Sequence, residues 1–391
     1  VLTNVPNLRF PEFEGEWVVS RLSEYLNENK ERNKKGLFNK TDVLSVSGDF
    51  GIVNQIDLLG RSFAGASVLP YHVVRLGNIV YTKSPLKEYP YGIVKTNTGK
   101  VGIVSTLYAV YSVNDNANNK FIEYYFSLAN RANRYFKPIV RIGAKHDMKI
   151  GNQEVLTNQV IFPTVKEQEK IADFLSLLDE RISTQNKIIE DLKKLKSAII
   201  EIEYSSRTKT SSHIGDFIVQ TSKRNKDNAI QTILSISNRQ GFIQQSEQFE
   251  NRSVASDDTS NYKIVERNSF AFNPARINVG SIARLATFDR GIVSPMYICF
   301  RTKDNLFPEY LDYYFESKQF FTEIQKRLEG SVRQCLSFEG LCNIPLSIPT
   351  IEVQQQTGKR LSTLAQEIKL EIDFLELLQK QKKFLLHQMF I

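Results

Sequence analysis

Two long stretches of the chain place apolar residues three and four positions apart, the spacing of a helix face that packs along a second helix. The first seam runs through Ile171, Leu175, Leu178, Ile182, Ile189 and Leu192, with Gln185 interrupting it, and the second through Leu361, Leu364, Ile368, Leu375 and Leu378. Pro163–Thr164 and Pro349–Thr350 directly precede these stretches, as suits a helix start. We expect two long helices that bury their seams against each other as an antiparallel coiled coil.

Further apolar residues lie off these seams and predict a second apolar face on the helices. They are Phe174, Leu177, Ile188, Phe374, Leu377 and Phe384. Either a partner protein or the chain's own modules could cover such a face.

The helices belong to an internal repeat. Residues 161–200 align with 347–386 at an offset of 186, which matches Gln168 with Gln354. Gly102–Ser105 recurs as Gly291–Ser294, and Phe121–Phe126 as Tyr310–Phe315, both at an offset of 189. Residues 22–26 align loosely with 214–218, and residues 83–85 with 272–274, but no similarity is visible between 28–75 and 220–265. A shared framework with divergent inserts predicts two recognition modules with different targets; duplication for structure alone is the alternative.

Between the helices the pattern is that of mixed α+β modules. Strands are expected at 45–47, 101–104, 109–113, 264–265, 270–272 and 297–300, and short helices at 121–130 and 309–319. The Tyr-Tyr-Phe run in each short helix is expected in the core rather than as a base-stacking platform. The predicted segments are a first module at 1–160, a helix at 161–204, a second module at 205–346 and a helix at 347–391, with residues 201–213 as a polar linker.

Composition places the chain among soluble proteins. No apolar run approaches the roughly 20 residues of a membrane span, and no secretory signal is recognisable. The three cysteines form no CxxC pair and the four histidines are scattered, so we expect neither disulfides nor structural zinc, and a cytoplasmic location. The formal net charge is +8, and residues 51–150 alone hold thirteen basic and five acidic residues. Basic modules suit a polyanion.

Three features together resemble a known family. They are the opening motif with Pro6, Leu8, Arg9, Phe10, Pro11, Phe13, Gly15 and Trp17, the two Gly-Ile-Val-Ser anchors, and the repeated Pro-Thr pair with a glutamine four residues on before a long helix. In these the chain resembles the specificity subunit of a type I restriction–modification enzyme. The resemblance covers nearly the whole chain.

This resemblance implies that two target-recognition domains each read one half of a bipartite, asymmetric double-stranded DNA site. The paired helices would set the spacing between the halves and dock two methyltransferase subunits, and restriction subunits would complete the enzyme. S-adenosylmethionine, ATP and Mg²⁺ would be used by those other subunits, with no cofactor in this chain. Gly358 stands where the first helix has Ala172, at a cost of about 1 kcal/mol in a helix interior, so we expect docking sites of unequal strength.

No catalytic motif is recognisable. Residues 272–275 read Phe-Asn-Pro-Ala and lack the second proline and the aromatic residue of an adenine methyltransferase, and no GxxxxGK(S/T) loop occurs. We therefore expect a non-catalytic subunit. A basic scaffold with nonspecific DNA binding or a protein-binding role, and a free-standing nucleic-acid enzyme, are the alternatives.

The candidate DNA contacts are residues whose chemistry suits base edges or phosphates and which come from polar loops or flank the repeated anchors. In the first module they are Lys83, Lys87, Lys95, Asn97, Lys100, Arg141 and Lys145, and in the second Arg224, Asn238, Arg239, Asn273, Arg276 and Arg333. We expect no catalytic residues and no metal ligands.

Overall fold

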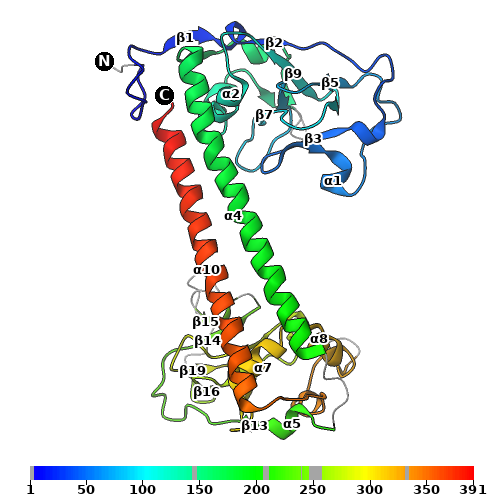
Figure 1. Ribbon diagram of the computed structural model, residues 1–391, viewed down its shortest axis with the longest axis vertical. Coiled ribbons are helices and arrows are strands. Elements are labelled where there is room, and N and C mark those ends of the chain that lie inside the picture. The colour runs from blue at the N-terminus through cyan, green and yellow to red at the C-terminus, as the bar shows by residue number, and fades with distance from the viewer. Residues whose placement is uncertain (1–3, 143–147, 206–210, 239, 246–257, 331–333) are drawn as a thin grey trace. The chain divides into compact units, whose positions relative to one another are not determined.

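Figure 1 shows the computed structural model of the chain, which describes residues 4–142, 148–205, 211–238, 240–245, 258–330 and 334–391. The chain divides into two compact units, residues 1–184 with 375–391, and residues 185–374. The division passes through two long helices, α4 (Val165–Ser205) and α10 (Ile351–Gln388). Each unit therefore consists of one module and one part of each long helix.

The module of the first unit is built on a four-stranded antiparallel sheet. Its order is β2 (Leu26–Glu28), β9 (Tyr108–Val113), β6 (Ile79–Thr82), β7 (Val94–Thr96). Three antiparallel pairs accompany it: β3 (Leu44–Ser47) with β4 (Gly51–Asn54), β5 (His72–Val74) with β8 (Gly102–Val104), and β1 (Val18–Arg21) with β12 (Gln159–Phe162). The short pair β10 (Arg141–Ile142) and β11 (Met148–Lys149) and the helices α1 (Gln55–Leu59), α2 (Asn119–Tyr125) and α3 (Ala129–Phe136) complete it.

The module of the second unit repeats this topology. Its sheet has the order β13 (Ile218–Thr221), β20 (Ile298–Thr302), β17 (Phe270–Phe272), β18 (Ile282–Arg284). The pairs are β14 (Leu234–Ser237) with β15 (Gly241–Gln244), and β16 (Lys263–Glu266) with β19 (Arg290–Val293). The helices are α5 (Ile214–Phe217), α7 (Pro308–Tyr314), α8 (Lys318–Gln325) and α9 (Phe338–Cys342). The predicted duplication is thus confirmed for the four-stranded sheet and for two strand pairs, while β1–β12 and β10–β11 have no counterpart among the described strands of the second module.

The long helices pack on each other within each unit, and the predicted coiled coil is confirmed. In the second unit Gln185 donates to Glu371 and Glu203 pairs with Arg360, so residue numbers rise along one helix as they fall along the other. In the first unit Asp179 pairs with Lys382. Ile171, Leu175, Leu178, Ile189, Leu361, Ile368 and Leu378 are buried, and Ile182, Leu192, Leu364 and Leu375 are half-buried.

A buried glutamine joins each module to the start of its following helix. Gln168 Nε2 donates to the carbonyls of Asn116 and Pro163, and its Oε1 accepts from Asn118 N–H. Gln354 repeats all three bonds with Asn305, Pro349 and Phe307. Both glutamines are 0 % exposed. The matched glutamines of the sequence repeat are therefore structural joints, which leaves them no free polar group for a ligand.

The aromatic runs also dock the helices. Tyr124 donates to Asp179, while the Lys382 ammonium lies 5.4 Å from the centre of its ring. At the matched positions Lys196 lies 5.1 Å from the ring of Tyr313. Phe121, Tyr124, Tyr125 and Phe126, and likewise Tyr310, Tyr313 and Tyr314, are buried, which confirms that these runs form the core.

Three element boundaries and one alignment differ from the sequence expectations. The helix expected at 121–130 is two helices, because α2 ends at Tyr125 and α3 begins at Ala129, and the one expected at 309–319 divides likewise into α7 and α8. Residues 201–205 belong to α4 rather than to a linker, because Tyr204 packs on Tyr310 and Tyr314 and extends the helix. Asn273 follows β17 directly and matches Thr82 rather than Ser84, since Tyr111 faces Ile79 and Phe300 faces Phe270.

The repeated anchor glycines are required by a close approach. A Cβ on Gly102 would lie 2.6 Å from the carbonyl oxygen of Asp42, and one on Gly291 would lie 2.5 Å from Leu234 Cδ1. Each glycine lets its strand run against the base of the neighbouring hairpin. Gly358 serves a similar purpose, because a Cβ there would lie 3.2 Å from Phe307 and Glu309. That glycine fits α10 to the module, which gives it a role independent of any partner.

The off-seam residues separate into two groups. Phe174 packs edge-on against Phe10, so part of this face is covered by the chain itself. Leu177, Leu377 and Phe384 in the first unit are about 60 % exposed, and Ile188 and Phe374 in the second are also exposed. The expected second apolar face therefore exists on the long helices.

Candidate nucleic-acid interface

The β3–β4 and β14–β15 hairpins are a repeat that the sequence comparison missed. Residues 44–55 and 234–245 match at an offset of 190, with Leu44/Leu234, Ser45/Ser235, Ser47/Ser237, Gly51/Gly241 and Gln55/Gln245. The expectation that 28–75 and 220–265 share nothing is therefore wrong. Small insertions move the offset from 189 at the anchors to 190 here, so a search at one fixed offset passes over the hairpins.

A buried asparagine fixes the loop before each hairpin. Asn33 donates to the carbonyl of Phe38 and accepts from its N–H, and Asn225 makes the same two bonds with Ile230. Their backbone N–H groups donate to Tyr71 and Tyr262. Arg32 and Arg224 directly precede these asparagines, so a cation is placed alike in both modules.

A polar cleft of about 560 Å³ opens in the second module beside the β14–β15 hairpin. It is lined by four serines, three side-chain amides, one arginine and a few apolar residues. The polar residues are Ser235, Ser237, Ser281, Ser294, Asn238, Gln245, Asn273 and Arg276. None of the described residues that line it is Asp or Glu. Its hydroxyls and amides can donate and accept hydrogen bonds, and its charge is positive.

A second cleft of the same module, about 710 Å³, is basic. Lys223, Arg224, Lys226 and Arg290 line it against two acidic residues, Asp227 and Glu266. Arg224 donates to Asn261 at 2.7 Å, and none of the four cations forms an ion pair with a described residue. Cations held apart from carboxylates suit phosphate groups.

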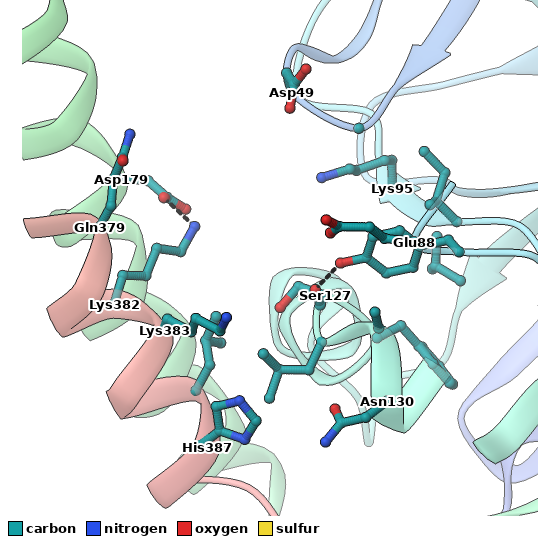
Figure 2. Close-up of a pocket in the computed structure, with 18 of the residues that line it drawn as sticks. Asp49, Glu88, Lys95, Ser127, Asn130, Asp179, Gln379, Lys382, Lys383 and His387 are labelled. Atoms are coloured by element: carbon teal, nitrogen blue, oxygen red, sulfur yellow. Dashed lines mark hydrogen bonds and ion pairs between the residues drawn. The ribbon is translucent and has the colours of Figure 1, made fainter. Parts of the chain in front are cut away.

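The first unit holds a cleft of about 680 Å³ between its module and the end of α10 (Figure 2). Lys382, Lys383 and His387 project from the helix, facing Asp49, Glu88 and Lys95 of the module. Lys382 is paired with Asp179, and Lys95 with Glu123 at 3.6 Å. Here Asp49, Glu88 and Asp179 balance the three lysines, so this cleft lacks the net positive charge of those in the second module.

The structure brings part of the predicted contact set together. Asn238, Asn273 and Arg276 line the polar cleft, and Arg224 lines the basic one. In the first module only Lys95 lines a described cleft, while Lys87, Lys100 and Arg141 are exposed elsewhere. Lys145, Arg239 and Arg333 lie outside the described residues. The basic residues Lys223, Lys226 and Arg290 were not singled out from the sequence, although Arg224 and Lys226 flank the buried Asn225.

Two predicted contacts are engaged inside the first module. Asn97 is 1 % exposed; its amide donates to the carbonyls of Arg75 and Lys100 and accepts from Gly99 N–H. Lys83 donates to Asn152, and burial lowers the pKa of its ammonium. In this structure both side chains hold the module together.

His72 makes the stability of the first unit depend on pH. Its imidazole is 1 % exposed, Nδ1 has no partner among the described residues, and burial together with Arg32 lowers its pKa to about 4. The unfolded chain takes up this proton near pH 6.5 and the folded one near pH 4. The free energy of unfolding should therefore fall by about 1.4 kcal/mol per pH unit between these values. The free energies of unfolding at pH 6.5 and pH 5 should differ by about 1.6 kcal/mol less in His72→Gln than in the wild type; an unchanged difference would contradict this.

A family model decides the identity of the two modules. The profile of the type I restriction modification DNA specificity domain matches residues 74–194 and again 242–380, about two thirds of the chain. The chain belongs to the type I restriction–modification specificity family. Each match begins inside a β-sheet module, at Val74 in β5 and at Phe242 in β15, and covers the rest of that module and most of the long helix that follows it. The duplicated unit found here therefore corresponds to the repeated domain of the family.

Solved structures agree with this fold. The type I restriction–modification S subunit of M. genitalium is 14 % identical, with a TM-score of 0.60 and coverage of 99 % of both chains. A structure described under complex assembly and conformational transition of the type I R-M system is also 14 % identical, with a TM-score of 0.51 over 96 % of this chain and 97 % of that one. The two-module, two-helix fold of this specificity protein is therefore shared along nearly its whole length.

Two further properties of the specificity protein concern its described part. None of its described helices combines the length and apolar character needed to span a bilayer. Within the same ranges no three His, Cys, Asp or Glu side chains gather as metal ligands would. The three cysteines are free thiols, and burial raises the pKa of Cys299 to about 12.

Proposed function

We propose that this chain is the non-catalytic subunit that gives a type I restriction–modification complex its DNA sequence specificity. Each module reads one half of a bipartite, asymmetric double-stranded site, and the two halves differ. The observation that carries this is the pair of modules with one topology and matched framework residues, whose cleft-forming positions differ. At two positions that line the polar cleft of the second module, Asn273 and Asn238, the first module has Thr82 and Gly48. A duplication kept only for structure needs no such divergence at its clefts.

We also propose that the long helices set the gap between the half-sites and dock two methyltransferase subunits. The helices are 41 and 38 residues long and join each module through a buried glutamine. Their exposed leucines and phenylalanines support a protein partner, because aliphatic and aromatic side chains in water gain about 25 cal/mol per Å² when covered. Restriction subunits would join this core.

The chemistry would belong to those partners. S-adenosylmethionine, ATP and Mg²⁺ would be bound by the methyltransferase and restriction subunits, and the complex would act on DNA in the cytoplasm. The polar cleft offers hydroxyls, amides and one cation, and the basic cleft offers four cations beside Asp227 and Glu266. Hydroxyls, amides and cations recognise nucleic acid without forming a covalent bond to it.

Selection from a random DNA library tests this function. The chain, co-purified with the methyltransferase subunit encoded with it, should recover two short defined blocks around an undefined gap of constant length. Tight, salt-sensitive binding with no recovered motif would favour the alternative of a basic scaffold that binds DNA without sequence preference. The salt dependence comes from released counterions in either case, so only the motif decides.

A further inference from the structure

In the second module the side-chain amide of Asn273 is held in one orientation by a backbone group two residues further along the chain. Asn273 is 7 % exposed and lines the polar cleft. Its Oδ1 accepts from the N–H of Ala275 at 3.1 Å. A backbone N–H can only donate, so the other amide atom is the NH₂ group. That group has no hydrogen-bond partner among the described residues and remains as a fixed donor.

The backbone of Asn273 is held as firmly as its side chain. Its N–H donates to the carbonyl of Ser281 at 3.0 Å, and its own carbonyl accepts from Arg276 N–H at 3.0 Å. The turn that fixes the amide thus also carries Arg276, which is exposed, lines the same cleft and makes no ion pair with a described residue. A fixed donor and a free guanidinium lie together in a cleft that has no carboxylate among its described lining.

The first module lacks this arrangement at the matched position. Thr82 is 4 % exposed, and its hydroxyl oxygen accepts from Ile93 N–H at 2.9 Å. The group that faces the cleft in one module is therefore used internally in the other. Two modules with the same framework need such differences in their side chains if they are to recognise different DNA sequences.

The two clefts of the second module share a wall. Ile230, Tyr262 and Ile292 form a small apolar cluster with Ile264 packed against it. Ile230 and Ile264 line the basic cleft, and Tyr262 lines the polar cleft. A surface with four cations thus adjoins a hydrogen-bonding surface whose one cation is Arg276, across a single layer of side chains. On duplex DNA the phosphates adjoin the base edges in the same way.

Resting on the proposed function, we propose that the polar cleft is the base-reading site of the second module, with Asn273 and Arg276 as the readers. The basic cleft binds the adjacent phosphates through Lys226 and its neighbours. Arg276 would take guanine, whose O6 and N7 accept a forked pair of hydrogen bonds. Asn273 would donate to an acceptor on a neighbouring base. The two clefts therefore have separate duties, one for specificity and one for affinity.

Asn273→Asp tests the donor with little change of shape. The aspartate keeps the oxygen that accepts from Ala275 N–H but replaces the free donor by an acceptor. In library selection with the co-purified methyltransferase, one position of one block should shift toward cytosine, whose N4 amino group donates. The other block and the gap should stay as in the wild type. Arg276→Ala should lose a guanine preference of about 5- to 150-fold at a nearby position of the same block.

Lys226→Ala is the matched control in the basic cleft. It should keep the wild-type motif while weakening all sequences alike, and should reduce the slope of log K against log salt by about 0.9. If the Asn273→Asp variant does not assemble with the methyltransferase, the motif recovered with Arg276→Ala tests the assignment alone. An unchanged motif in Arg276→Ala, or in an assembled Asn273→Asp variant, overturns the assignment while the proposed function stands. A wild-type protein that recovers no split motif would instead refute the proposed function.

Discussion

Replacing Gln354 with leucine should lower the free energy of unfolding of the second unit by about 3–5 kcal/mol. The glutamine is 0 % exposed and bonds three backbone groups, those of Asn305, Phe307 and Pro349. Leucine has a similar volume but leaves these buried groups without partners, and each orphaned group costs about 1–3 kcal/mol. Gln168→Leu should act in the same way on the first unit, because its three bonds are the same. Chemical denaturation, followed separately in each unit by hydrogen exchange, measures both losses.

Gln356→Leu is the matched control, because Gln356 lies two residues away on the exposed side of α10. Its effect should stay within about 0.5 kcal/mol. The joint would be refuted as a structural element if Gln354→Leu were as mild as this control. If the two joints are equivalent, the stability losses in Gln168→Leu and Gln354→Leu should differ from each other by less than either loss itself.

Glu167→Ala should cost about 3–5 kcal/mol and release the N-terminal segment of the first unit. Both carboxylate oxygens of Glu167 accept from Arg9, each at 2.8 Å, and one also accepts from Trp17 Nε1 at 3.2 Å. The side chains of Glu167 and Arg9 are 2 % and 14 % exposed. Removing Glu167 leaves the partly buried Arg9 guanidinium without its carboxylate and the buried Trp17 Nε1 without its acceptor, which is expensive although Arg9 keeps its bonds to the carbonyls of Glu14 and Gly15. Amide exchange over residues 4–17 should accelerate in step with the loss of stability.

Val353 supplies the comparison, since it occupies the position of Glu167 in the second copy and is 38 % exposed. Val353→Ala should change stability by less than about 1 kcal/mol. Slow exchange over residues 4–17 in Glu167→Ala would show that Leu8, whose N–H donates to Gln388, holds the segment without the ion pair.

The long helices and the duplication could be predicted from the sequence almost completely. A seam with steps of three and four over 30 residues has few other interpretations, and Pro163 and Pro349 mark where each helix begins. Short elements were located less well, because a break such as that between Tyr125 and Ala129 follows from packing of the aromatic run rather than from local preference. The start of the polar linker was misplaced for the same reason: residues 201–205 are helical because Tyr204 is buried against the second module.

The clefts could be foreseen only in part. Asn238, Asn273 and Arg276 were named from their chemistry, but nothing in the sequence shows that the β14–β15 hairpin and the turn after β17 bring them to one cavity. The opposite error is Asn97, whose loop is polar yet folds back so that its amide serves the backbone. Tertiary contacts decide whether a polar side chain is exposed, so exposure cannot be predicted from neighbouring residues. The apolar period of an amphipathic helix, in contrast, can be recognised in the local sequence.

Duplicating one module in place of the other tests most directly whether each module is an independent reader. Residues 214–344 would replace 22–158, because Leu22 N–H bonds Asn158 and Ile214 N–H bonds Ile344 at matching points. The grafted segment keeps Phe307, Tyr310 and Tyr313 for the glutamine joint and the helix contacts. Library selection with the methyltransferase should then recover the second module's block on both sides of a gap of unchanged length. Recovery of the wild-type motif by an assembled graft, or of one block only, would contradict the account.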